Sequence, residues 1–494
     1  MQSGSCLLTR DRGLLWTILI VALALRVWFL TNGVPHAVGI DEPAIVDRAL
    51  RILTTGDWNP HVFDYPTLTI YVHAFAAAAR FMLGAMQGQW ASLAEFDIAA
   101  VYQTGRALSA VIGTATVWLT YRIGRDLRSA PLGLLAAAQL AVLPMHVRES
   151  HFILTDVPVT ALTTLTVWLS MRAAVKHDAG SYAVAGAAAG LAAAAKYNGG
   201  VAIVAVIAAW ALHEWSTDGA GRKFSGALLG AAAAFLMAAP FTLLDLPAFL
   251  NGFAAQAARF SPRNRHLPEP AWLLYLKHLG LSSKLWLPAA AAGAIVVGLR
   301  ASARVRWAPA VLFAMAYFYI LATHPLVFGR YALPLLPILC LLSAGLVVEV
   351  ASAVARTRPG RGGASPIVLV AGSLLLTTNF AVQSVGWLTS MNRRDTRQIA
   401  AEWMRENVAD GARIAVENSG PTYMGAGGFA VRAVEMLSDH PVDWYIRDRI
   451  EYLVVTSADR DRMAPFLGAG QIVFEIAPTP QRWGPPVRIV RLGS

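Results

Sequence analysis

The feature that most restricts this chain is a series of apolar runs of roughly 16–22 residues, a length that can cross a membrane. With 56% hydrophobic and 14% charged residues, the chain is too apolar for an ordinary soluble domain. We therefore predict an all-α polytopic membrane protein with about eleven transmembrane helices. The predicted spans are 14–33, 100–122, 131–146, 156–173, 181–196, 198–214, 226–245, 284–300, 308–323, 330–352 and 366–388. The first is expected to remain as an anchor.

Basic residues predict the orientation of these spans, because Lys and Arg concentrate in loops on the cytoplasmic side. Alternate loops carry the clusters Arg122/Arg125/Arg128, Arg172/Lys176, Arg222/Lys223, Arg300/Arg304/Arg306 and Arg356/Arg358/Arg361. These loops account for much of the net charge of +11, which therefore does not indicate nucleic-acid binding. The apolar run 66–86 would invert the alternation if it crossed the membrane, so we predict a juxtamembrane or re-entrant helix there. The N-terminus is then cytoplasmic.

The chain divides into a predicted membrane domain, 1–388, and a more polar domain, 389–494. In the second, Asp395 can cap an amphipathic helix that ends at Gly411. Four short segments, 413–416, 451–456, 471–476 and 487–492, are typical of strands. We predict a small α/β domain outside the membrane. Because the Ala-, Gly- and Arg-rich composition is typical of bacteria, the expected location is the inner membrane, with this domain in the periplasm.

Two outer loops, 34–99 and 246–283, follow from this topology, and the first contains the adjacent carboxylates Asp41 and Glu42. A carboxylate at a membrane surface can accept a proton from a nucleophile, or hold a metal that orients a phosphate. The alternative is structural, since Asp41 followed by Pro43 is also a good helix start.

Other polar residues fall at the outer ends of spans. Asp156 and Lys196 can be functional, or can be a helix cap and a solvated loop lysine. Arg330 can bind a phosphate or belong to an interfacial Arg-Tyr belt. The residues predicted to bind substrates are Asp64, Tyr65, Arg106, Arg148, His151, Lys196, Tyr197, Arg330 and Tyr331. The His residues 61, 146, 151 and 324 lack paired spacing on one helix, so a divalent metal is possible but has no evident ligand set.

Taken together, these motifs resemble the integral-membrane glycosyltransferases of the C-type fold. The likeness rests on Asp41-Glu42, Tyr65-Pro66, Arg106, Arg148 to Asp156, Lys196-Tyr197-Asn198 and Arg330-Tyr331-Ala332-Leu333-Pro334, in this order and on one side of the membrane. It is closest to bacterial relatives of protein O-mannosyltransferases and of aminoarabinose transferases. It covers about residues 14–350. The aminoarabinose branch has Lys-Pro-Pro where this chain has Asp64-Tyr65-Pro66, which argues against lipid A modification.

The resemblance implies a sugar donor linked to a polyprenyl phosphate and inversion at the anomeric carbon. By that resemblance Asp41 is the general base, Glu42 orients the loop or the acceptor, and Asp156 is a second acid of the cavity. Lys196 and Arg330 would neutralise the phosphate leaving group. The acceptor (protein, glycan or lipid) stays open. Two other classes are also open, a transporter or lipid flippase and a membrane-anchored assembly protein.

Overall fold

A computed structural model describes residues 2–259, 267–281, 283–357 and 364–493, and the chain falls into two compact units. Unit 1 comprises Met1–Trp28, Ile45–Met82 and Gly105–Gly386, and unit 2 comprises Phe29–Ala44, Leu83–Thr104 and Trp387–Ser494. Unit 2 therefore combines the C-terminal residues with two segments that lie mostly in the predicted outer loop 34–99.

Unit 1 is helical. Its helices, some of which extend into unit 2, are α1 Gln2–Val27, α2 Glu42–Thr55, α3 Leu68–Met86, α4 Ile98–Leu127, α5 Ala130–Val142, α6 Pro144–Glu149, α7 Asp156–Lys176, α8 Ala179–Ala195, η2 Tyr197–Ala202, α9 Ile203–His213, α10 Ala220–Ala238, α11 Phe241–Leu244, α12 Leu246–Arg259, α13 Ala271–Gly280, α14 Trp286–Leu299, α15 Ala301–Thr323, η4 Gly329–Leu335, α16 Leu336–Arg356 and α17 Pro366–Met391.

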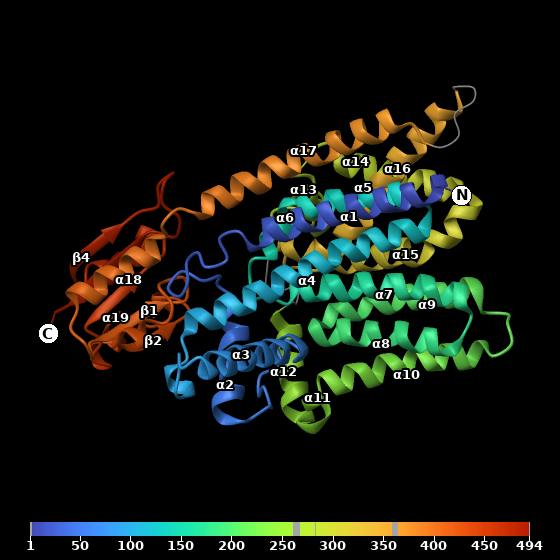
Figure 1. The fold of residues 1–494 in the computed structure, drawn as a ribbon. Helices are drawn as coiled ribbons and strands as arrows, with labels where there is room; N and C mark the ends of the chain where they lie inside the picture. Colours follow the sequence, from blue (N-terminus) through green and yellow to red (C-terminus); the bar gives the residue numbers. More distant parts are fainter. Residues whose placement is uncertain (1, 260–266, 282, 358–363, 494) are drawn as a thin grey trace. The chain divides into compact units, whose positions relative to one another are not determined.

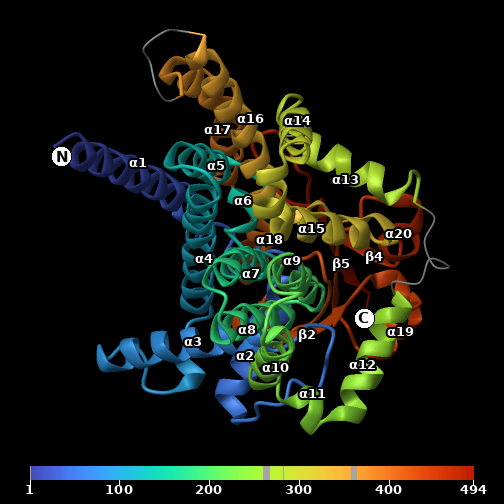
Figure 2. The same cartoon turned by 90° about the vertical axis from the view of Figure 1, so that its right-hand side faces the viewer.

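Small residues allow the central helices of unit 1 to pack closely. Helices α7, α8, α9 and α10 lie side by side (Figures 1 and 2). On α8, a Cβ built on Gly186 would lie 1.9 Å from the carbonyl oxygen of Ala227 on α10, and one on Gly190 would lie 2.1 Å from that of Ala231. This is the four-residue spacing of small residues that brings membrane helices into backbone contact.

Arg26 is fully buried on α1, where its side chain caps the end of another helix. Its guanidinium donates to the carbonyl oxygens of Leu140 and Ala141, at 3.1 and 2.9 Å, in the last turn of α5. The carbonyls of a last helical turn have no partner within their own helix. Arg26 therefore satisfies groups that would otherwise be buried without hydrogen bonds.

Four helices among the described residues are long and apolar enough to cross a membrane: Leu68–Met86, Ala303–Thr323, Gly329–Arg356 and Pro366–Met391. Four shorter apolar helices are Ala130–Val142, Ala179–Ala195, Tyr197–His213 and Trp286–Leu299. The predicted count of eleven is not confirmed. Leu68–Met86 is a helix, as expected, and its re-entrant path stays a prediction. Arg358 and Arg361 of the last basic cluster, and 260–266 of the second outer loop, lie outside the described residues.

Unit 2 contains a five-stranded mixed sheet in the order β2-β1-β3-β5-β4, in which β1 pairs in parallel with β2 and β3, and β5 pairs antiparallel with β3 and β4. Its elements are η1 Leu93–Glu95, α18 Thr396–Asn407, β1 Arg413–Glu417, η5 Met424–Gly427, β2 Ala430–Val434, η6 Leu437–Asp439, α19 Val442–Arg447, β3 Tyr452–Val455, α20 Arg460–Leu467, β4 Gly470–Ile476 and β5 Val487–Leu492.

Alternation along the strands gives the sheet two buried faces. Ile414 and Val416 of β1 pack with Met404 of α18, whereas Ala415 between them packs with Tyr445 of α19. The predicted cap is present, since Asp395 and Gln398 form a capping box at the start of α18. The helix ends at Asn407, before the predicted Gly411.

Candidate active site

Asp156 is the first residue of α7 and is 3% exposed. The N-cap position is occupied by Thr155, so the structure does not place Asp156 at the cap, which was one of its two interpretations. One carboxylate oxygen of Asp156 accepts from Lys196 Nζ at 2.6 Å, and the other lies 3.7 Å from Arg330 Nε. Three residues that are far apart in the chain thus meet at one end of unit 1.

Lys196 reaches Asp156 because the chain breaks between α8 and η2. Lys196 has extended backbone angles (φ −157°, ψ 132°), and its carbonyl accepts from the Gly199 amide at 2.7 Å. A Cβ on Gly199 would lie 2.3 Å from the carbonyl oxygen of Ala192 and 2.5 Å from Val159. The Gly in this motif therefore permits the close turn that directs the lysine toward α7.

Aromatic rings surround the two cations. Lys196 Nζ lies 4.0 Å from the centroid of the Tyr331 ring, and the Arg330 guanidinium lies 4.9 Å from that of Phe328. Such cation–π contacts hold a cation without neutralising its charge. We refer to Asp156, Lys196, Arg330 and Tyr331 as the Asp156 cluster. It contains two cations and one carboxylate, so it carries an excess positive charge.

Two further residues, which the sequence analysis did not identify, support this cluster. Tyr317 of α15 accepts a hydrogen bond from Asn198 Nδ2 at 3.0 Å and donates to the carbonyl oxygen of Tyr331 at 3.3 Å. Glu149 is buried, and that burial raises the pKa of its carboxyl, with the Asp156 charge acting in the same direction. Both depend on contacts across the fold, and no local sequence signal identifies them.

The remaining predicted binding residues fall into separate environments of unit 1. Asp64 forms a bidentate ion pair with Arg48 at 2.8 and 3.1 Å and accepts from the Tyr65 amide at 2.9 Å. Tyr197, the residue after Lys196, donates to the carbonyl oxygen of Phe63 at 3.2 Å. The segment ending in Tyr65 is therefore attached to the same turn that carries Lys196.

Arg106, Arg148 and His151 lie on or beside α4 and α6. The guanidinium of Arg106 is buried, 5.8 Å from the centroid of the Phe152 ring, and Arg148 forms an ion pair with Glu149 at 2.5 Å. Both ring nitrogens of His151 face backbone carbonyls, and burial lowers the pKa of its imidazole to about 4. The neutral ring donates to one of these carbonyls, so these contacts hold the backbone of Val147 or Trp28.

In unit 2, Asp41 immediately precedes the first residue of α2. The buried Glu42 folds back, and its carboxylate accepts from the Gly39 amide at 2.7 Å while its own amide donates to the Gly39 carbonyl. These two hydrogen bonds close a tight turn that presents Asp41. Asp41 thus lies immediately before the helix, as the helix-start interpretation expected, and inside this turn.

The residues just before this turn are held by the C-terminal part of the chain. Arg397 of α18 donates to the carbonyl oxygens of Val38 and Ala37, at 3.1 and 3.4 Å, and pairs with Asp395 at 2.9 Å. Thr422 donates from its amide to the His36 carbonyl at 3.0 Å. The α/β fold of unit 2 therefore fixes the backbone that leads to Asp41.

Among the described residues, no group of three or more His, Cys, Asp or Glu side chains is arranged to hold a metal ion. The question of a divalent metal, which the sequence left open, stays open.

The comparisons with known proteins support the C-type fold. The profile of the family described as dolichyl-phosphate-mannose-protein mannosyltransferase matches residues 79–243. ArnT from Cupriavidus metallidurans, in a crystal structure with bound undecaprenyl phosphate, aligns over 96% of this chain and 97% of its own, with a TM-score of 0.64 and 16% identity. AglB, an oligosaccharyltransferase of Archaeoglobus fulgidus in complex with an inhibitory peptide and a dolichol-phosphate, aligns over 90% of this chain and 69% of its own, with a TM-score of 0.58 and 12% identity. No curated protein sequence matches the chain. The resemblance predicted from the motifs is confirmed at the level of fold.

Proposed function

We propose that this chain, which has the fold of the C-type glycosyltransferases, moves a sugar from a polyprenyl-phosphate donor to an acceptor hydroxyl. The reaction takes place on the periplasmic face of the bacterial inner membrane. Solved relatives that hold undecaprenyl phosphate or a dolichol-phosphate support this choice of donor. The acceptor is a glycan, a lipid or a protein.

The observation that carries this proposal is the excess positive charge of the Asp156 cluster. When the sugar leaves, negative charge develops on the phosphate, and preorganised cations in a low-dielectric site stabilise that charge. Lys196 and Arg330 are two such cations, and the single carboxylate of Asp156 orients both. Arg330 adds the planar guanidinium geometry that suits phosphate oxygens.

The step itself is a displacement with inversion. The acceptor oxygen forms a bond to the anomeric carbon, and the bond from that carbon to the phosphate oxygen breaks, with its electron pair going to the phosphate. Asp41 accepts the hydroxyl proton as general base. Glu42 is a positioning residue, because its hydrogen bond to Gly39 holds the turn that carries Asp41.

The test uses the full chain in nanodiscs, with polyprenyl phosphates carrying different sugars, and measures release of polyprenyl phosphate. Asp41→Asn should lower kcat by about a hundredfold or more. The matched control is Asp57→Asn. Asp57 is an exposed acid of the same predicted outer loop and pairs with His61 at 2.6 Å. Its substitution should leave kcat unchanged. Lys196→Gln and Arg330→Gln should weaken donor binding and lower turnover.

Wild-type turnover in the Asp41→Asn protein would remove Asp41 from the base role. A protein that carries the intact donor across the bilayer, without releasing polyprenyl phosphate, would instead be a flippase.

A further inference from the structure

A second charged region lies at the other end of α7 from Asp156, within unit 1. There α4 ends at Leu127, α7 ends at Lys176, α9 ends at His213, and α15 begins at Ala301. Because α7 rises about 1.5 Å per residue, its two ends lie about 30 Å apart. This region is therefore distinct from the Asp156 cluster.

A cavity of about 610 Å³ opens between these helix ends. We call it the basic cavity, because its lining contains four cationic side chains and one carboxylate. The charged residues are Arg122, Asp126, Arg172, Lys176 and Arg306. An anion of the size of a phosphate group is the ligand that such a lining favours.

Two arginines of the basic cavity are held by rings rather than by acids. The Arg122 guanidinium lies 4.9 Å from the centroid of the Trp168 ring, and that of Arg172 lies 5.1 Å from it. Asp126 accepts from Trp168 Nε1 at 2.9 Å. Within the described part of the chain, Arg122, Arg172 and Arg306 form no ion pair with a carboxylate.

Arg122 also carries a buried donor without a partner. Its Nε is inaccessible to solvent and has no hydrogen-bond acceptor among the described residues. Leaving such a donor unpaired costs about 1–3 kcal/mol, and more for a charged group. A phosphate oxygen entering the basic cavity would supply an acceptor to this guanidinium.

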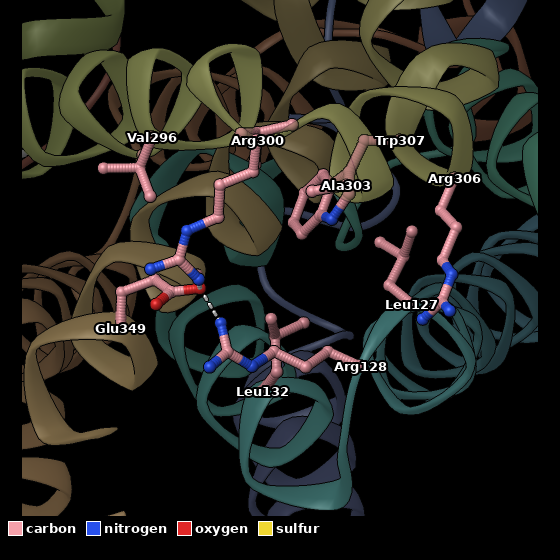
Figure 3. Close-up of a pocket in the computed structure, with 12 residues that line it drawn as sticks. Leu127, Arg128, Leu132, Val296, Arg300, Ala303, Arg306, Trp307 and Glu349 are labelled. Carbon is pink, nitrogen blue, oxygen red and sulfur yellow. Dashed lines mark hydrogen bonds and ion pairs between the residues drawn. The ribbon is translucent and has the colours of Figure 1, made fainter. Parts of the chain in front are cut away.

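In the neighbouring cavity, by contrast, two arginines have a carboxylate partner. This cavity has a volume of about 170 Å³, and in it both Arg128 and Arg300 pair with Glu349 (Figure 3). Arg306 also lines this cavity, on the other side of Trp307 from Glu349 (Figure 3). Arg122 and Arg172 line the basic cavity alone and Arg306 lines both, so these three arginines, which have no carboxylate partner among the residues that the structure describes, meet at the basic cavity.

An apolar cavity of about 530 Å³ adjoins the basic cavity. Val305 lines both cavities, and the consecutive residues Leu212 and His213 line the apolar and the basic one respectively. The other apolar lining residues come mainly from α14 and α15, including Val297, Gly298, Val311 and Leu312. A ligand with a phosphate and a hydrocarbon chain can therefore occupy both at once.

We propose that the two cavities together bind one anionic diacyl phospholipid of the surrounding membrane. Its phosphate contacts Arg122, Arg172 and Arg306, and one acyl chain lies along α15 in the apolar cavity. Basic pockets between membrane helices on the cytoplasmic side are where anionic headgroups bind, and the positive charge of these loops predicts that side. This site is independent of the sugar transfer proposed above.

The test measures lipid binding to the purified full chain in detergent by native mass spectrometry. The probes are phosphatidylglycerol with long acyl chains, phosphatidylglycerol with six-carbon chains, and phosphatidylcholine. The wild type should bind long-chain phosphatidylglycerol at least about tenfold more tightly than phosphatidylcholine. The double variant Arg122→Gln/Arg306→Gln should lose about 30-fold in phosphatidylglycerol affinity, at about fivefold per charge. The matched control Arg125→Gln, an exposed arginine of the same helix end outside the cavity lining, should bind like the wild type.

A second variant tests the acyl chain while keeping every arginine. A Cβ built on Gly298 meets no atom within 4 Å, so Gly298→Leu fills the apolar cavity without a clash with the backbone. Gly298→Leu should weaken the binding of long-chain phosphatidylglycerol and leave the binding of the six-carbon lipid unchanged. The proposal is overturned if the wild type binds phosphatidylglycerol and phosphatidylcholine equally well. It is also overturned if Gly298→Leu changes the affinity for neither phosphatidylglycerol. If the wild type binds the long-chain and the six-carbon phosphatidylglycerol equally well, the site recognises only the phosphate, and the proposal is overturned.

Discussion

The attachment of the Asp41 turn to α18 leads to the most quantitative prediction. Arg397→Gln removes the hydrogen bonds to the carbonyls of Val38 and Ala37, at 3.1 and 3.4 Å. A hydrogen bond to a charged donor contributes about 1.5–3 kcal/mol. Since the second contact is long, we expect the free energy of opening this segment to fall by about 2 kcal/mol in all.

That change is measurable by hydrogen–deuterium exchange. The Gly39 and Glu42 amides are hydrogen-bonded in the closed turn, so a 2 kcal/mol loss should accelerate their exchange by about 30-fold. If Asp41 is the base, kcat should fall while the KM for the donor changes little. Arg397→Lys should recover only part of the effect, because lysine keeps the charge beside Asp395 but has no fork to reach both carbonyls.

The matched control is Arg394→Gln, which lies three residues earlier and loses only an exposed pair with Glu402. Exposed ion pairs contribute about 0–1 kcal/mol, so exchange at Gly39 and Glu42 should be unchanged. Unaltered exchange in Arg397→Gln, or an equal increase in both variants, would refute the argument that Arg397 holds the turn.

Two further predictions concern packing and pH. Gly190→Ala places a Cβ 2.1 Å from the Ala231 carbonyl oxygen, so it should force α8 and α10 apart and cost about 1–3 kcal/mol, seen as a lower unfolding temperature. Gly221→Ala on α10, where a Cβ meets nothing within 4 Å, should not lower it. Burial chiefly lowers the pKa of His36, whose neutral ring donates to the Thr422 carbonyl at 2.8 Å. The unfolded chain takes up this proton at about pH 6.5, so stability falls as the pH drops below that value. His36→Asn should lose less stability than the wild type between pH 7 and pH 5; identical losses would contradict this assignment.

Much of the secondary structure could be predicted because its signals are local. Apolar runs predicted the helices, and Asp395 predicted the start of α18. The strands β1, β3, β4 and β5 were expected from their alternation. β2, a short edge strand whose residues are mostly exposed, was missed. The length of an apolar run likewise could not establish how many helices cross the membrane.

The candidate site was predicted in its residue types and only partly in its arrangement. Asp156, Lys196 and Arg330 were each identified as charges at the outer ends of spans, where a charge is costly. Nothing local showed that the lysine and the arginine share one carboxylate. Arg106 and His151 were predicted from the same kind of signal, and their contacts are with a ring and with backbone carbonyls.

Hydrophobicity and capping act within one or two helical turns. From these local signals the sequence predicts a helical membrane protein with a small α/β domain and an ordered set of charged motifs. Which of these charges meet depends on how the segments pack in three dimensions. The Lys196–Asp156 pair joins residues 40 positions apart, and Arg397 reaches a carbonyl 359 positions away. The Lys196–Asp156 pair depends on the close backbone approach that Gly199 permits. Such contacts are properties of packing, which no single segment encodes.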